Sequence, residues 1–125
     1  ELMVPVRHGA DGGKHAKTLY DVKAQAGQKA AWVIMMPLTG RTHQLRLHMQ
    51  LLGAPIAGDP KYMTDRPLPG GIEMSLHLHA RSLTIPREGK SDLSFQAPLP
   101  EHMESAFKML GFNPENDDVD WDALS

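Results

Sequence analysis

One stretch of the sequence, residues 31–53, constrains the fold more than any other part of the chain. Its apolar start, residues 31–36, predicts a buried strand, and Pro37 and Gly40 then predict a tight turn. Thr42 is the expected N-cap of a helix, because its hydroxyl can accept a hydrogen bond from a free amide of the first turn. Apolar residues recur at helical spacing beyond it: Leu45, Met49 and Leu52.

Two arginines fall within this expected strand–turn–helix unit. Arg41 lies in the turn, and Arg46 lies one turn into the helix, where a packed backbone can hold its guanidinium still. A fixed guanidinium suits two-pronged contact with a carboxylate or a phosphate. The free amides at a helix start also favour a nearby anion. The unit is therefore expected to face an anion, whose identity these residues leave open.

The charge of the chain is unevenly distributed. The 125 residues carry a formal net charge of -2, but residues 113–125 contain five acids and no lysine or arginine. The rest of the chain therefore has 13 basic and 10 acidic residues. This balance is compatible with nucleic acid, and equally with an ordinary solvated surface. The acidic tail is expected to be either disordered or docked through Trp121.

Other global features exclude whole classes of protein. The chain has no cysteine, so disulfides and thiolate metal sites are unavailable, which fits a reducing compartment such as the cytoplasm. No apolar run approaches the roughly 20 residues needed to span a bilayer, so no membrane partner is expected. The first residues show neither an initiator methionine nor a signal peptide, which suggests a chain that begins within a longer protein.

The rest of the chain predicts an α+β fold, an antiparallel or mixed sheet with two main helices. Residues 1–16, rich in glycine, are expected to be a loop or linker. Strands are expected where apolar and polar residues alternate or where short apolar runs occur. A second helix is expected where a proline at the start, acids in the first turn, a lysine near the end and a final glycine follow one another. The expected strands are 17–26, 30–36, 76–85 and 93–97, the first two paired antiparallel, and the second helix is 100–111.

Polar residues outside this unit have simpler interpretations. Asp59, in a Gly-Asp-Pro turn, is interpreted as a turn residue that hydrogen-bonds its own backbone, with a catalytic acid as the rarer alternative. His77 and His79 share a face of their expected strand, and His43 and His48 lie in the helix. A histidine-based metal enzyme is a distant alternative, because no ligand set has metal-site spacing, and no metal or cofactor is expected.

Three ordered blocks of the sequence resemble a known family. Residues 39–48 (TGRTHQLRLH) resemble the third motif of the RluA-type pseudouridine synthases, and residues 58–62 and 76–80 are similar to later blocks of that family. The strand at 93–97 resembles the family's closing strand. The resemblance covers about residues 17–111 and is somewhat nearer to the enzymes of large-subunit ribosomal RNA.

The resemblance implies isomerisation of a uridine in RNA to pseudouridine without metal or cofactor. The glycosidic C–N bond breaks, the base turns over and a C–C bond forms, after the base has been flipped out of the RNA. Arg46 corresponds to the arginine that pairs with the catalytic aspartate of the family. The residues implied to contact RNA phosphates or to hold the shape of the turn are Arg41, Thr42, His43 and Gln44.

The sequence departs from the family at one decisive point. The family's catalytic aspartate lies in an upstream His-Arg-Leu-Asp segment, which is absent here, as is the next motif with its tyrosine. Asp21 and Asp59 are not substitutes for the aspartate, and Arg46 is expected to lie without its acidic partner. Residues 17–112 are therefore expected to be the C-terminal part of a catalytic domain, preceded by the 1–16 linker and followed by the 113–125 acidic tail.

Two functions follow from this departure. The chain is either an inactive part of a longer enzyme of ribosomal RNA or a non-catalytic RNA-binding module that binds RNA in a salt-dependent way. A partial sheet exposes its cut edges, so a homo-oligomer formed through these edges is also expected.

Overall fold

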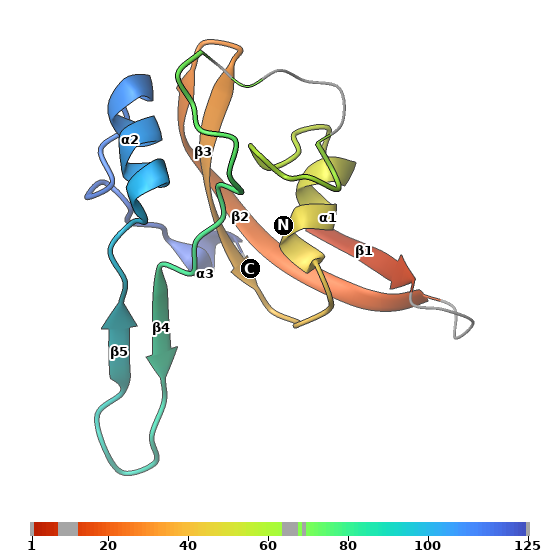
Figure 1. Ribbon diagram of the computed structural model, residues 1–125. Helices are drawn as coiled ribbons and strands as arrows, with labels where there is room; N and C mark the ends of the chain where they lie inside the picture. Colours follow the sequence, from red (N-terminus) through yellow and green to blue (C-terminus); the bar gives the residue numbers. More distant parts are fainter. Residues whose placement is uncertain (1, 8–12, 64–67, 69, 125) are drawn as a thin grey trace.

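The computed structural model describes residues 2–7, 13–63, 68 and 70–124. Its largest sheet has the strand order β1-β2-β3, with β1 at Leu2–Arg7, β2 at Gly13–Ala26 and β3 at Ala30–Pro37. Both pairs are antiparallel, and the long β2 holds the centre of this sheet (Figure 1). The expected β2–β3 hairpin with its turn at residues 27–29 is confirmed.

Two sequence predictions for this sheet are wrong. The loop predicted over residues 1–16 contains β1 and the start of β2, because the first half of β2 pairs with β1 from Arg7↔Gly13 to Leu2↔Thr18. Residues 8–12 of that prediction lie outside the described part. The strand predicted to be central, β3, is the edge strand of the described sheet, since β2 provides its only described neighbour. The division of the chain into domains stays a prediction.

A second, two-stranded sheet follows, formed by β4 (Ser82–Ile85) and β5 (Leu93–Gln96), and it projects away from the rest of the chain (Figure 1). The predicted strand over residues 76–85 is too long: residues 76–81 have no strand neighbour in the described part. Their hydrogen bonds go to other segments instead: the amide of His77 donates to the carbonyl of Ala57 (2.9 Å), and the carbonyl of Leu76 lies 3.0 Å from Nε2 of His102.

The second main helix packs against β3 through aromatic side chains. Helix α2 (Glu101–Leu110) begins after Pro100 and ends at Gly111, which has a positive φ of 78°, as predicted. Its Phe107 and the following Phe112 pack on Trp32 of β3, with ring centroids 5.0 and 6.3 Å away. Such aromatic contacts bury large apolar area, so they fix α2 against the sheet.

The acidic tail is docked rather than disordered. It ends in a short helix, α3 (Trp121–Leu124), which packs against β2. The Lys23 ammonium of β2 donates to the carbonyl of Asp118, and Arg81 pairs with Asp117 at 3.6 Å. The predicted α+β class with two main helices, α1 (Gln44–Leu51) and α2, is therefore confirmed. No helix in the described residues is long and apolar enough to cross a membrane.

Candidate active-site half at the start of helix α1

The turn before α1 is held by a side chain rather than by the expected N-cap. The helix begins at Gln44, and the preceding residue, His43, has left-handed backbone angles (φ 53°, ψ 25°). Thr42 is exposed and forms no cap. Histidine tolerates this conformation better than a β-branched residue does, so the chain can turn sharply here. Because this turn places His43 directly before the helix, the prediction of Thr42 as N-cap is wrong.

Gln44 fastens the turn to β2. Its side chain is buried, and its Oε1 accepts hydrogen bonds from the Thr39 hydroxyl (2.7 Å) and the Arg41 amide (3.1 Å). Its Nε2 donates to the Lys17 carbonyl and to the Thr18 hydroxyl oxygen, both at 2.9 Å. With all four bonds internal, Gln44 holds the shape of the turn, the second of the two roles that the resemblance allowed.

A buried histidine extends this polar network. His48 is fully buried, and its Nδ1 lies 2.8 Å from the Thr18 hydroxyl. Its Nε2 has no hydrogen-bond partner in the described structure. Burial lowers the pKa of His48 below its usual value, because the charged imidazolium would lose its solvation. His48 is therefore part of the interior that supports the site and takes no part in contacts with a ligand.

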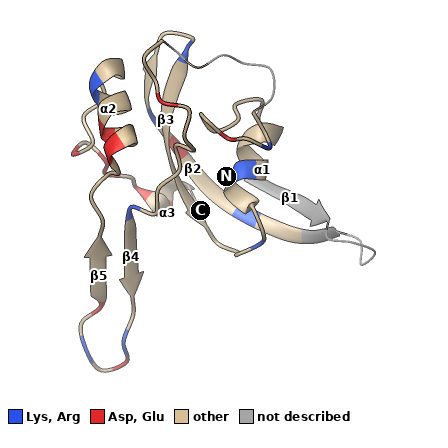
Figure 2. Ribbon diagram, viewed as in Figure 1, with Lys and Arg blue, Asp and Glu red and all other residues tan. Residues whose placement is uncertain are grey.

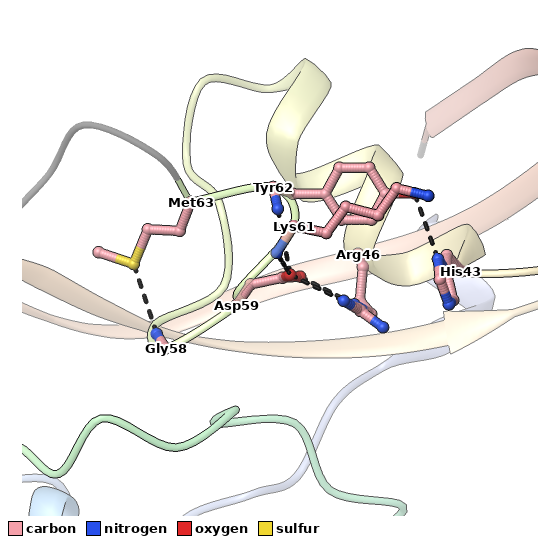
Figure 3. A network of polar contacts seen from close by, with 7 residues as sticks. All are labelled: His43, Arg46, Gly58, Asp59, Lys61, Tyr62 and Met63. Carbon is pink, nitrogen blue, oxygen red and sulfur yellow. Dashed lines mark hydrogen bonds and ion pairs between the residues drawn. The ribbon is translucent and has the colours of Figure 1, made fainter.

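The central contact of the site joins Arg46 to Asp59. The Arg46 Nε donates to one carboxylate oxygen at 2.9 Å and its second guanidinium nitrogen donates to the other at 2.8 Å (Figure 3). The Asp59 side chain is wholly buried, whereas that of Arg46 keeps 17% of its surface exposed. Arg46 therefore has an acidic neighbour within this chain that the sequence analysis did not foresee, while its pairing with the catalytic aspartate of the family stays a prediction.

Asp59 also organises its own turn. Its Oδ1 accepts hydrogen bonds from the amides of Lys61 (2.9 Å) and Tyr62 (3.1 Å), as its interpretation as a turn residue predicted. The hydrogen bond from Arg46, with these two amides, lowers the pKa of Asp59 to about 2 against the opposing effect of burial. The same pair raises the pKa of Arg46. Both groups are therefore charged near neutral pH.

The pair uses only part of the guanidinium. Arginine has five N–H donors, and the described contacts with Asp59 use two of them. The remaining donors can meet a further carboxylate or a phosphate. A hollow of about 470 Å³ lies beside the pair, and its wall includes Arg46, Asp59, Met63 and Ser75. The geometry therefore provides a fixed cation at the wall of an open hollow.

The half-buried Tyr62 lies against this arginine and connects it with the exposed His43. The Tyr62 ring lies 5.4 Å from the Arg46 guanidinium carbon, and its hydroxyl lies 3.3 Å from Nδ1 of His43 (Figure 3). Arg41 is exposed, and its Nε donates to the His15 carbonyl at 3.3 Å. Of the predicted contact residues, Arg41, Thr42 and His43 thus lie on the surface, and Gln44 lies beneath it.

Two residues of this site were not recognised from the sequence. The sequence analysis interprets Asp59 as a turn residue, with a catalytic acid as the rarer alternative, and gives Tyr62 no role. The signal for Asp59 was its place in the Gly-Asp-Pro turn that follows the helix, since such a turn brings the chain back past Arg46. The histidines considered for a metal site do not gather around a common point. The His77 ring packs against the ring of His102, with centroids 4.8 Å apart. The described residues contain no group of three or more potential ligands that could hold a metal.

Comparison with known proteins identifies the class. The chain is 35% identical over 116 residues to the dual-specificity RNA pseudouridine synthase RluA of Vibrio parahaemolyticus, which covers 90% of this chain and 42% of that protein. It is 41% identical over 91 residues to the ribosomal large subunit pseudouridine synthase C of Rickettsia typhi, covering 73% of this chain and 30% of that one. No family model matches the sequence.

A solved structure supports the same class. Human RNA pseudouridylate synthase domain containing 4 superposes with a TM-score of 0.67 at 31% identity, over 86% of this chain and 47% of that protein. The fold and these likenesses show that the chain is part of a pseudouridine synthase domain. Within that class, the chain belongs to the RluA-type family. It spans about two-fifths of the length of the RluA relatives that it matches.

Proposed function

We propose that this chain is the arginine-bearing part of an enzyme that converts uridine to pseudouridine in RNA, and specifically in large-subunit ribosomal RNA. The observation that carries the proposal is the bidentate Arg46–Asp59 pair, which holds a partly exposed guanidinium at the wall of a hollow. The names of the relatives support the reaction and the RNA class.

Arg46 is the catalytic-site residue in this proposal, and it acts by electrostatics. Its free donors hold the catalytic aspartate of the His-Arg-Leu-Asp segment in its ionised form and in the correct orientation. Asp59 does not replace that aspartate, because its carboxylate is buried and accepts four hydrogen bonds within its own turn and from Arg46. Arg41, Thr42 and His43 lie on the surface where RNA contacts are proposed.

The 125-residue chain by itself is expected to be inactive, because it lacks the aspartate segment. The test is incubation with ribosomal RNA that carries unmodified target uridines, followed by mass spectrometry for pseudouridine. Pseudouridine above the level of a no-protein control would contradict this expectation. The gene product with the residues encoded before Glu1 is the matched comparison, and a His-Arg-Leu-Asp segment there, together with activity, would support the proposal.

A non-catalytic RNA-binding module is the second candidate. It is favoured by the exposed Arg41 and His43 at the start of α1, which require no aspartate to contact phosphates. A natural gene without the aspartate segment, whose product binds RNA but never forms pseudouridine, would establish this candidate in place of the enzyme. Both candidates bind RNA, and for the enzyme of large-subunit ribosomal RNA we propose a cytoplasmic location.

Self-association is a separate part of the proposal. Cross-strand partners Leu83 and Phe95, and Ile85 and Leu93, lie on one face of the β4–β5 hairpin, and all four are exposed. An apolar strand pair without a cover favours association, as do unpaired strand edges. Light scattering of the purified chain tests this, and a monomer at every concentration would refute it.

A further inference from the structure

Three side chains converge beside Arg46 at the surface of the site. The His43 and Tyr62 rings meet edge to face, with centroids 5.9 Å apart and 86° between their planes. The Lys61 ammonium lies 5.4 Å from the centre of the Tyr62 ring. Figure 3 shows the Lys61 side chain running along this ring towards its hydroxyl end, on the side where His43 lies. An ammonium, a phenol and an imidazole thus share one small area.

The backbone of these residues is fixed by the site itself. Both Lys61 and Tyr62 donate their amides to Oδ1 of Asp59, the carboxylate that also holds Arg46. His43 is fixed by the left-handed turn before α1. The three groups are therefore pre-organised relative to the guanidinium, which reduces the entropy lost when they bind a ligand.

The charges of this area favour an anion. Lys61 and His43 are exposed, and no described acidic residue forms an ion pair with either of them. The acidic residues of α2 lie apart from α1 on the other side of the molecule (Figure 2). In the tautomer that carries a proton on Nδ1, His43 donates to the Tyr62 oxygen, and the hydroxyl proton of Tyr62 is then available to an acceptor outside the protein.

We propose that Lys61, Tyr62 and His43 bind a backbone phosphate of the RNA, next to the nucleotide that faces Arg46. The inference rests on the proposed function, which makes RNA the ligand, and adds two residues to its contacts. Lys61 supplies charge to the phosphate, and Tyr62 supplies a neutral hydrogen bond. A single phosphate at this point sets the register of the RNA strand relative to Arg46 and carries no sequence information.

The test measures binding of fluorescein-labelled, uridine-containing single-stranded RNA to the 125-residue chain by fluorescence anisotropy across a series of salt concentrations. Lys61→Ala and Tyr62→Phe are each expected to weaken binding roughly three- to tenfold. Loss of the Lys61 charge also reduces the slope of log affinity against log salt by about 0.7, because one fewer counterion is released. Tyr62→Phe removes a neutral group and leaves this slope unchanged.

Lys90→Ala is the matched control, because Lys90 is an exposed lysine in the turn beyond β4, far from α1 (Figure 1). It should leave both affinity and slope unchanged, and thermal melts should show all three variants folded. Equal effects of Lys61→Ala and Lys90→Ala, or an unchanged affinity of Lys61→Ala, would overturn the inference while the proposed function stands. Absence of salt-dependent RNA binding by the wild-type chain would overturn both.

Discussion

Replacement of Asp59 by asparagine removes the negative charge from a fully buried side chain while keeping its size. In the native structure one oxygen accepts from the Arg46 Nε, and the other accepts from Arg46 and from the amides of Lys61 and Tyr62. An asparagine NH₂ in place of either oxygen faces at least one of these N–H donors. The substitution therefore weakens the charge pair and creates a contact between two donors.

The magnitude follows from the pKa of the carboxylate. Folding lowers the pKa of Asp59 from 3.8 to about 2. At about 1.4 kcal/mol per pKa unit, the charged form contributes about 2.5 kcal/mol to stability. The facing donors add about 1 kcal/mol or more. We therefore expect Asp59→Asn to lower the free energy of unfolding by about 3.5 kcal/mol at pH 7, a large part of the stability of a single domain.

Urea denaturation followed by tryptophan fluorescence measures this loss at pH 7 and again in steps to pH 2. Because the folded-state pKa is depressed, the contribution of Asp59 is complete well above pH 3.8 and is lost as the pH falls towards 2. The difference between wild type and variant should therefore shrink over this window. A loss below about 0.5 kcal/mol at pH 7, or a difference that does not change with pH, would refute the reasoning.

Asp117→Asn is the control for this measurement. Asp117 also pairs with an arginine, but at 3.6 Å from Arg81 and with 25% of its side chain exposed. Such a solvated pair contributes at most about 1 kcal/mol. A similar loss for Asp59→Asn and Asp117→Asn would show that burial and two-pronged geometry do not account for the stability of the Arg46 pair.

Two further substitutions test the frame of the site. His48 is buried and has a lowered pKa, so wild-type stability should fall as the pH drops below 6.5, by at most about 1.4 kcal/mol per pH unit. In urea titrations at pH 7 and 5, His48→Gln should lack this part of the pH dependence. An equal change in the free energy of unfolding between pH 7 and 5 for wild type and variant would contradict this role of His48. Gly58 has a φ of +76°, and an added Cβ would lie 1.9 Å from the Ser75 carbonyl oxygen, so Gly58→Ala should cost more than about 2 kcal/mol in a thermal melt. Gly27→Ala, where φ is also positive but the space is open, provides the comparison and should cost less.

The sequence by itself determined the elements whose signals are local. The hairpin of β2 and β3 followed from alternation around a turn, and α2 followed from Pro100 at its start and Gly111 at its end. The strand–turn–helix unit, with Arg46 in its helix, also followed from patterns within a few residues, although the later start of α1 places Arg46 in its first turn. Such features depend on backbone preferences and short-range periodicity, which a sequence states directly.

Tertiary structure alone decided the contacts between distant segments. That β1 pairs with β2, that β2 rather than β3 is central, and that residues 76–81 form no strand all depend on which neighbours are present. The N-cap position falls on His43 instead of Thr42, and the turn is held by Gln44, whose partners on β2 lie 26 and 27 residues away. The pairing of Arg46 with Asp59 was likewise hidden, because the sequence shows that a carboxylate can satisfy its own turn but not that the returning chain aims it at a guanidinium. Hydrogen bonds between side chains require positions in space, and those positions exist only once the chain has packed.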